Sequence, residues 1–67
     1  MNKLPERLKE LRADKGLTQG KLADQLQIHR VTYQYWEKGK SQPDIDKLLL
    51  LADFYKVSTD YLIGRYN

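Results

Sequence analysis

Apolar residues recur at helical spacing from the start of the chain, which restricts it to folds built from α-helices. Leu4, Leu8 and Leu11 stand at i, i+4 and i+7, the spacing of one face of a helix. Pro5 suits the first turn of that helix, and Gly16 suits its end. The sequence shows neither the alternating apolar pattern of a β-strand nor an internal repeat. We therefore predict an all-α fold.

A helix-turn-helix is predicted between about residues 18 and 38. Thr18 can cap a helix of about two turns, because its side-chain oxygen can accept a free backbone N–H. The apolar face of that helix comprises Leu22, Ala23 and Leu26. Only a few residues connect it to a third helix, which ends before Gly39.

Two further helices are predicted in the C-terminal half. Asp44 can cap a fourth helix, and Ser58 can cap a short fifth helix that ends near Gly64. The inward stripe predicted for the fourth helix is Ile45, Leu48, Leu49, Ala52 and Tyr55. The 67 residues include no cysteine, so no disulfide can hold the chain together and stability must come from packed helices or a partner chain. We expect residues 1–67 to form one compact five-helix domain.

Catalysis, metal binding and membrane insertion are not expected. The chain has one histidine, no cysteine and no glycine-rich phosphate loop, so we predict no catalytic residues, metal site, cofactor or small-molecule ligand. Its longest apolar run, residues 48–52, is far shorter than the ~20 residues that span a bilayer, and no signal sequence opens the chain. The expected setting is the cytoplasm, in association with the nucleoid.

Positive charge is concentrated in the first forty residues. These carry nine Lys/Arg against five Asp/Glu, a net of +4, whereas residues 41–67 carry three against four, a net of −1. A basic half joined to a nearly neutral half is typical of a nucleic-acid surface beside a packing or dimerisation surface. Charge alone fits an ordinary solvated surface equally well.

The residues of the predicted third helix divide into two opposed faces. At 100° per residue, one arc carries Arg30, Val31, Gln34, Tyr35 and Lys38. The opposite arc carries Thr32, Tyr33 and Trp36, of which the two aromatic residues are interpreted as core. Arginine and glutamine are the side chains that recognise guanine and adenine edges in the major groove. The outward arc is therefore a candidate DNA-reading face.

Residues 8–64 resemble, nearly end to end, the phage-repressor-like (Cro/XRE) helix-turn-helix domains, whose fold is that of lambda repressor. The resemblance rests on LTQ..LA in the second helix, WE.GK at the end of the third, the proline before the fourth and VS.DYL in the last. It implies that the third helix enters the major groove of double-stranded DNA while the second crosses the backbone.

Residue roles follow from the resemblance by position. The expected base contacts are Arg30, Val31, Gln34 and Tyr35, with Arg30 bidentate to a guanine. The expected contacts to the DNA backbone are Thr18, Gln19, Lys21, His29, Lys38, Lys40 and Ser41. Arg12 and Glu37 match a family pair that joins the first helix to the end of the third.

Three departures from the family pattern affect the second and third helices. Gly20 and Lys21 stand where two glutamates are usual, which removes negative charge near a phosphate but costs about 1 kcal/mol of helix propensity at Gly20. Gln27 replaces the usual turn glycine, so a positive φ is expected there. His29 replaces a Ser/Thr cap and is either a tolerated weak cap or a DNA contact.

The C-terminal half carries the expected dimer interface. Leu50 and Phe54 form an i, i+4 apolar pair away from the predicted stripe of the fourth helix. The predicted interface comprises Leu50, Phe54, Tyr61, Ile63 and Tyr66. Alternatively, the last three of these residues cover the first two within one monomer. The resemblance implies a two-fold dimer.

The function predicted from these features is that of a sequence-specific transcriptional regulator, a repressor that binds a palindromic operator as a homodimer. The alternative is a protein-binding module with the same fold, such as an antitoxin or a prophage protein, partnered by a toxin or an antirepressor.

Overall fold

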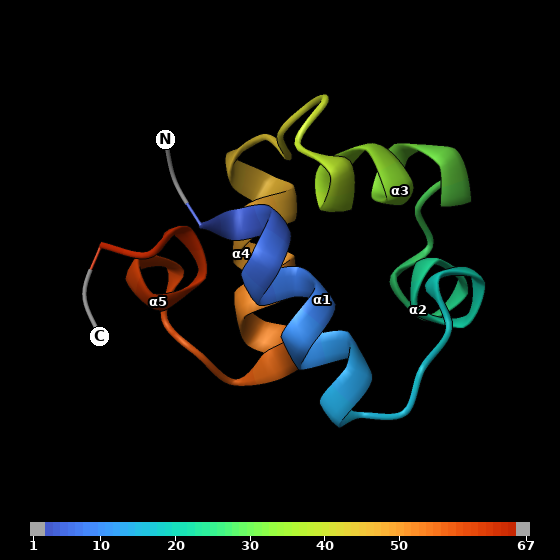
Figure 1. Cartoon of the computed structure of the whole chain (residues 1–67), viewed down its shortest axis with the longest axis horizontal. Coiled ribbons are helices and arrows are strands. Elements are labelled where there is room, and N and C mark those ends of the chain that lie inside the picture. The colour runs from blue at the N-terminus through green and yellow to red at the C-terminus, as the bar shows by residue number, and fades with distance from the viewer. Residues whose placement is uncertain (1–2, 66–67) are drawn as a thin grey trace.

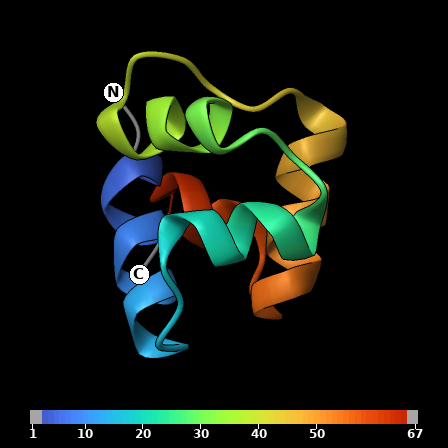
Figure 2. The same ribbon diagram turned by 90° about the vertical axis from the view of Figure 1, so that its right-hand side faces the viewer.

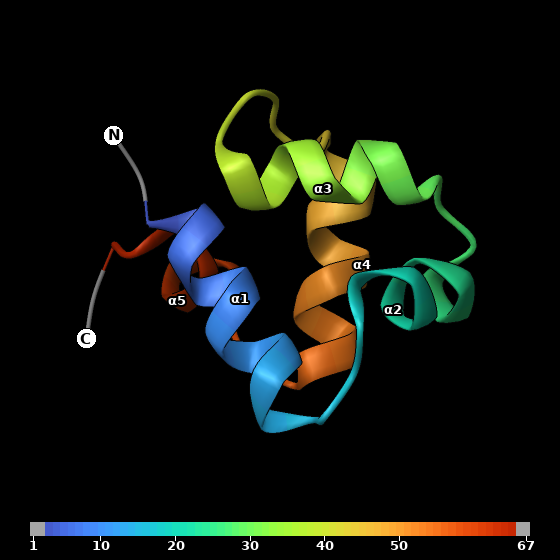
Figure 3. The ribbon, with the colours of Figure 1, turned by 45° about the vertical axis from the view of Figure 1, so that its right-hand side comes forward.

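The computed structural model describes residues 3–65, which form five α-helices and no strand. The helices are α1 (Leu4–Asp14), α2 (Gln19–Leu26), α3 (Arg30–Lys38), α4 (Ile45–Tyr55) and α5 (Thr59–Ile63). In three views turned about the vertical axis, α3 and the loop after it stay at the top of the domain, level with the start of α4, with α2, α5 and the rest of α4 below (Figures 1, 2 and 3). The third helix therefore lies along one edge of the molecule. No helix within residues 3–65 is long and apolar enough to cross a membrane.

The predicted helix ends are confirmed where a local capping interaction defines them. The side chains of Thr18, Asp44 and Ser58 each accept a hydrogen bond from the backbone N–H three residues later, at 3.1, 2.9 and 3.0 Å. His29 makes no such bond at the start of α3. Gln27 adopts the expected left-handed conformation, with φ of 58°. This conformation turns the chain from α2 into α3 within three residues.

Each helix contributes one completely buried side chain to a single core. These residues are Leu8, Leu22, Tyr33, Leu51 and Leu62. Burial of an aliphatic side chain of this size stabilises a fold by roughly 1.5–3 kcal/mol. Trp36 is also buried and meets the Tyr33 ring edge to face, so the predicted inward face of α3 is confirmed. The core therefore holds α3 by its aromatic side and leaves the opposite side free.

The predicted inward stripe of α4 is wrong at two positions. Ile45 is 70% exposed and Leu49 is 50% exposed, whereas Leu51 is fully buried. Four consecutive leucines, residues 48–51, satisfy more than one rotation of the helix, so spacing alone does not select the buried face. The structure turns α4 so that Leu51, Ala52 and Tyr55 enter the core.

Phe54 is half-buried, because the same rotation of α4 brings it against the core. Its ring lies against the core, 5.0 Å from the Tyr55 ring, and the Lys15 ammonium lies 5.3 Å from its centre. Phe54 therefore packs within the monomer rather than standing beside Leu50 on an exposed surface.

Candidate nucleic-acid interface

A partly buried ion pair joins α1 to the end of α3. Arg12 Nε donates to Glu37 Oε2 at 2.7 Å, and Arg12 Nη2 donates to Glu37 Oε1 at 3.2 Å. The remaining guanidinium nitrogen, Nη1, donates to the carbonyl of Leu17 at 2.9 Å. Glu37 is only 2% exposed. The structure thus confirms the expected contact between Arg12 and Glu37.

Gln19 extends this network to the start of α2. Its side-chain Nε2 donates to Glu37 Oε1 at 2.9 Å, so the carboxylate accepts from both α1 and α2. The resemblance placed Gln19 only at the DNA backbone, and sequence reasoning missed its contact with Glu37. These hydrogen bonds link the first three helices, and they therefore hold α2 and α3 in a fixed relative orientation.

The network keeps Glu37 ionised despite its burial. Burial alone would raise the pKa of this carboxyl, but the hydrogen bonds from Arg12 and Gln19 outweigh burial and lower the pKa below its usual value. The same hydrogen bond with Glu37 raises the pKa of Arg12. Glu37 is the only acidic residue between positions 25 and 43. Since its charge is buried and neutralised, the surface of this segment presents cationic groups alone.

The predicted reading arc of α3 faces outward. Val31 is 52% exposed, Tyr35 is 42% exposed, Arg30 is exposed and Gln34 is half-buried. Gly39 ends the helix in a left-handed conformation, with φ of 76°, and turns the chain back so that Lys40 Nζ lies 5.5 Å from the centre of the Tyr35 ring. Lys38 is also exposed. Apolar contact groups and cations therefore occupy the same surface.

The starts of α2 and α3 enclose a small hollow. It is lined by Thr18, Gln19, Gly20, Arg30 and Gln34. Two predicted backbone contacts and two predicted base contacts thus lie together, although Thr18 and Gln19 precede Gln34 by 16 and 15 positions. Lys21 is exposed on the same first turn, and its backbone N–H is held by Thr18.

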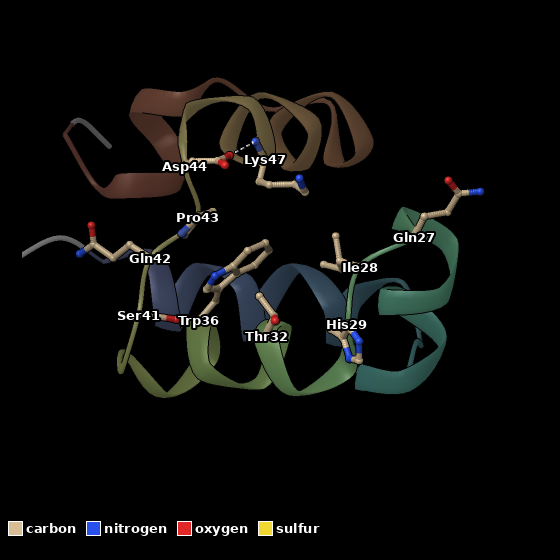
Figure 4. Close-up of a pocket in the computed structure, with 10 residues that line it drawn as sticks. All are labelled: Gln27, Ile28, His29, Thr32, Trp36, Ser41, Gln42, Pro43, Asp44 and Lys47. Atoms are coloured by element: carbon tan, nitrogen blue, oxygen red, sulfur yellow. Dashed lines mark hydrogen bonds between the residues drawn. The ribbon is translucent and has the colours of Figure 1, made fainter.

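His29 and Ser41 lie in a different hollow, between α3 and the start of α4. Figure 4 shows the ten residues that line it, with the Trp36 ring extending from α3 toward the segment that begins α4. Thr32 and Trp36 belong to the arc opposite the reading face. His29 and Ser41 are both exposed at the edges of this hollow. The structure therefore separates these two predicted contacts from the hollow at the start of α2.

The predicted dimer residues do not form one exposed patch. Leu50 is 38% exposed, but Phe54 packs against the core and Tyr61 lies under Arg7, whose guanidinium carbon is 4.2 Å from the ring centre. Ile63 is half-buried, and its carbonyl accepts the backbone N–H of Lys3 at 3.0 Å. Tyr66 lies outside the described residues. The exposed apolar side chains of α4 are instead Ile45, Leu49 and Leu50, which we call the α4 apolar face.

The raised pKa values of the two core tyrosines, Tyr33 and Tyr55, predict that the folded protein loses stability at alkaline pH. Burial raises the pKa of Tyr55 to about 12 and also raises that of Tyr33. An unfolded tyrosine ionises near pH 10, so the unfolded chain loses protons first and becomes favoured as pH rises. The contribution of the two protonated tyrosines to folding stability is complete below about pH 10. The contribution of Tyr55 is lost as pH approaches 12. The melting temperature should fall between pH 9 and 11.5, and should fall less in Tyr55→Phe. Equal falls in both proteins would contradict this assignment.

A short turn between two packed helices, the second exposed along an edge, defines a helix-turn-helix domain. The chain belongs to the helix-turn-helix family, whose characteristic sequence matches residues 8–62. The resemblance to Cro/XRE domains is thereby confirmed, as is the five-helix fold. A crystal structure of a transcriptional regulator from Listeria innocua superimposes on 100% of this chain and 63% of its own, with a TM-score of 0.90 and 31% identity.

Curated relatives are transcriptional regulators. The chain is 44% identical over 62 residues to the regulator ImmR of Bacillus subtilis, covering 92% of this chain and 49% of that protein. It is 40% identical over 59 residues to the transcriptional activator BcrR of Enterococcus faecalis, covering 88% and 29%. It is 34% identical over 64 residues to the cryptic phage CTXphi transcriptional repressor RstR of Vibrio cholerae, covering 96% and 57%. The chain spans about half the length of ImmR and RstR and less of BcrR.

Proposed function

We propose that this protein is a sequence-specific DNA-binding regulator that represses transcription by occupying a roughly palindromic operator as a homodimer. The observation that carries the proposal is the outward face of α3, where exposed cations accompany hydrogen-bonding and apolar side chains while the one nearby carboxylate is buried and paired. A surface of this composition suits phosphates and base edges at once.

The base contacts proposed are those of the reading arc. Arg30 donates two hydrogen bonds to a guanine, and Gln34 pairs with an adenine edge. Val31 packs on a thymine methyl group, and Tyr35 lies beside Val31. Lys40, which lies over the Tyr35 ring, is directed toward the DNA backbone. Arg30, Val31 and Tyr35 are exposed and Gln34 is half-buried, which supports this assignment.

The backbone contacts proposed lie on both sides of α3. Thr18, Gln19 and Lys21 surround the start of α2, whose free N–H groups favour an anion. Because the Gln19 amide nitrogen already bonds Glu37, its main contribution is through the backbone N–H. The remaining proposed contacts are His29, Lys38, Lys40 and Ser41.

Lys40→Ala tests the phosphate assignment. If Lys40 neutralises one phosphate, the variant should bind all duplexes less tightly, and the slope of log K against log salt should become shallower by about 0.9 per site. The measurement is a fluorescence anisotropy titration at several salt concentrations. Lys9→Ala, which removes the same charge from an exposed position on α1, should leave the slope unchanged. An unaltered slope in Lys40→Ala would remove this residue from the interface.

The α4 apolar face supports the homodimer. Ile45 and Leu49 lie on one side of α4 and Leu50 lies 100° further round the helix, and large apolar side chains exposed close together mark protein contacts. Leu50→Glu should therefore shift the protein toward the sedimentation coefficient of a monomer. Gln25→Glu, which adds the same charge on the exposed side of α2, should sediment like the parent.

The same face favours a second candidate function. If Leu50→Glu leaves sedimentation unchanged, the second-copy interface fails, and α4 would instead contact a different protein such as a toxin or an antirepressor.

Repression is proposed because blocking a promoter requires only occupancy of the operator by the domain described. The relatives include one protein named as an activator and one named as a repressor. A reporter whose promoter overlaps the operator should be expressed less when the protein is present. Increased or unchanged expression with an occupied operator would contradict repression.

A further inference from the structure

Gly20 lies directly beneath the guanidinium of Arg30. A Cβ placed on Gly20 would overlap Arg30 Nη2 and lie 2.9 Å from both Cζ and Nε. Contacts this short do not occur between real side chains, so any residue other than glycine at position 20 would displace the guanidinium. The first turn of α2 and the first residue of α3 are therefore in contact, and this contact is possible only because position 20 has no side chain.

The glycine is not needed for the backbone. Gly16, Gly39 and Gly64 have positive φ values that other residues rarely adopt, but Gly20 has an ordinary helical conformation. Glycine is also less favourable than alanine inside a helix. What Gly20 supplies at this position is space, and the side chain that fills the space is Arg30.

The Arg30 guanidinium packs against Gly20 and has no hydrogen-bond acceptor within residues 3–65. Within residues 3–65 its guanidinium makes no hydrogen bond and no ion pair, and the hollow around it is lined by Thr18, Gln19 and Gln34. Contact with Gly20 restricts the side chain while its N–H donors stay available. A restricted arginine loses less conformational entropy when it binds than a freely rotating one.

We propose that Gly20 is a specificity-determining position, because it seats the Arg30 guanidinium against the first turn of α2 and orients its free donors for the operator. This inference rests on the proposed function in that Arg30 must contact DNA for the orientation to matter. Gly20 itself needs no contact with DNA, so it acts as a positioning residue.

The test uses the full chain and four variants: Gly20→Ala, Arg30→Ala, the double variant, and Gln25→Ala as a control. Folding should tolerate Gly20→Ala, because the overlap falls on the flexible end of an arginine, and the melting temperature should not drop. Operator affinity should fall roughly threefold to tenfold, the cost of ordering one long side chain. The base preference at the position read by Arg30 should weaken as well. Gln25→Ala changes an exposed residue of the same helix and should bind like the parent.

Two outcomes decide the proposal. In the Arg30→Ala background, Gly20→Ala should have no further effect, whereas an equal loss in both backgrounds would show that Gly20 acts independently of Arg30 and overturn the inference. In the DNA-free protein, ¹⁵N relaxation of Arg30 Nε should report greater motion in Gly20→Ala than in the parent, and equal motion would also overturn it. If the parent selects no DNA sequence, the proposed function fails, while the relaxation comparison still decides whether Gly20 seats Arg30.

Discussion

Replacing Arg12 by alanine is expected to cost about 3–5 kcal/mol of folding stability, because it leaves the buried Glu37 carboxylate without its cation. Glu37 would keep the hydrogen bond from Gln19 but lose both from Arg12, and almost none of its surface is open to water. Small domains have only about 5–15 kcal/mol of stability in total. The variant should therefore be partly unfolded well below the melting temperature of the parent, as measured by circular dichroism.

The pH dependence of this loss separates an unpaired charge from simple loss of packing. In the parent, the lowered pKa of Glu37 contributes stability above the unfolded value, near pH 4, and that contribution is lost as pH falls through the folded pKa. In Arg12→Ala, protonation would instead relieve a buried charge. The difference in stability between the two proteins should therefore shrink between pH 7 and pH 3.

A double variant, Arg12→Met with Glu37→Met, provides the matched control. Both charges are then absent, so much of the lost stability should return. A cost below about 1 kcal/mol for Arg12→Ala would contradict the account, since it is the value typical of an exposed pair.

Arg30→Ala should have the largest effect on sequence discrimination. A bidentate contact to guanine contributes about 1–3 kcal/mol of discrimination, and a two-fold dimer makes it twice, so the operator should lose about 2–6 kcal/mol relative to an operator mutated at that base. Arg30→Lys keeps the charge but not the bidentate geometry, so it should retain affinity for random DNA and still lose the base preference. The measurement is a competition titration against operators changed at one symmetric pair of positions. Uniform weakening across all sequences would instead make Arg30 a phosphate contact.

The parts of the fold that depend on neighbouring residues were predictable from the sequence. The caps at Thr18, Asp44 and Ser58 each involve atoms three residues apart, so local chemistry determines them. The aromatic side of α3 was predictable because Tyr33 and Trp36 are the large rings opposite its polar arc. The pairing of Arg12 with Glu37 joins residues 25 apart and was expected only through the family resemblance.

The rotation of α4 and the contact made by Gly20 depend on how the helices pack, so the sequence alone did not predict them. Leucine at four successive positions left the rotation of α4 open, and packing against the rest of the core selected Leu51 over Leu49. From the sequence, Gly20 indicated a loss of helix propensity and of negative charge near a phosphate but no role in packing, because its contact with Arg30 requires the positions of two helices to be known. A glycine inside a short helix that has no need of positive φ was nevertheless a usable sign of close approach.

Selection from a pool of random duplexes tests most directly whether this domain reads a DNA sequence. The protein should enrich a two-fold symmetric motif with half-sites about 34 Å apart, and it should bind the selected duplex about a thousandfold or more tighter than random DNA at physiological salt. Enrichment of no motif, together with equal affinity for selected and random duplexes, would contradict the account.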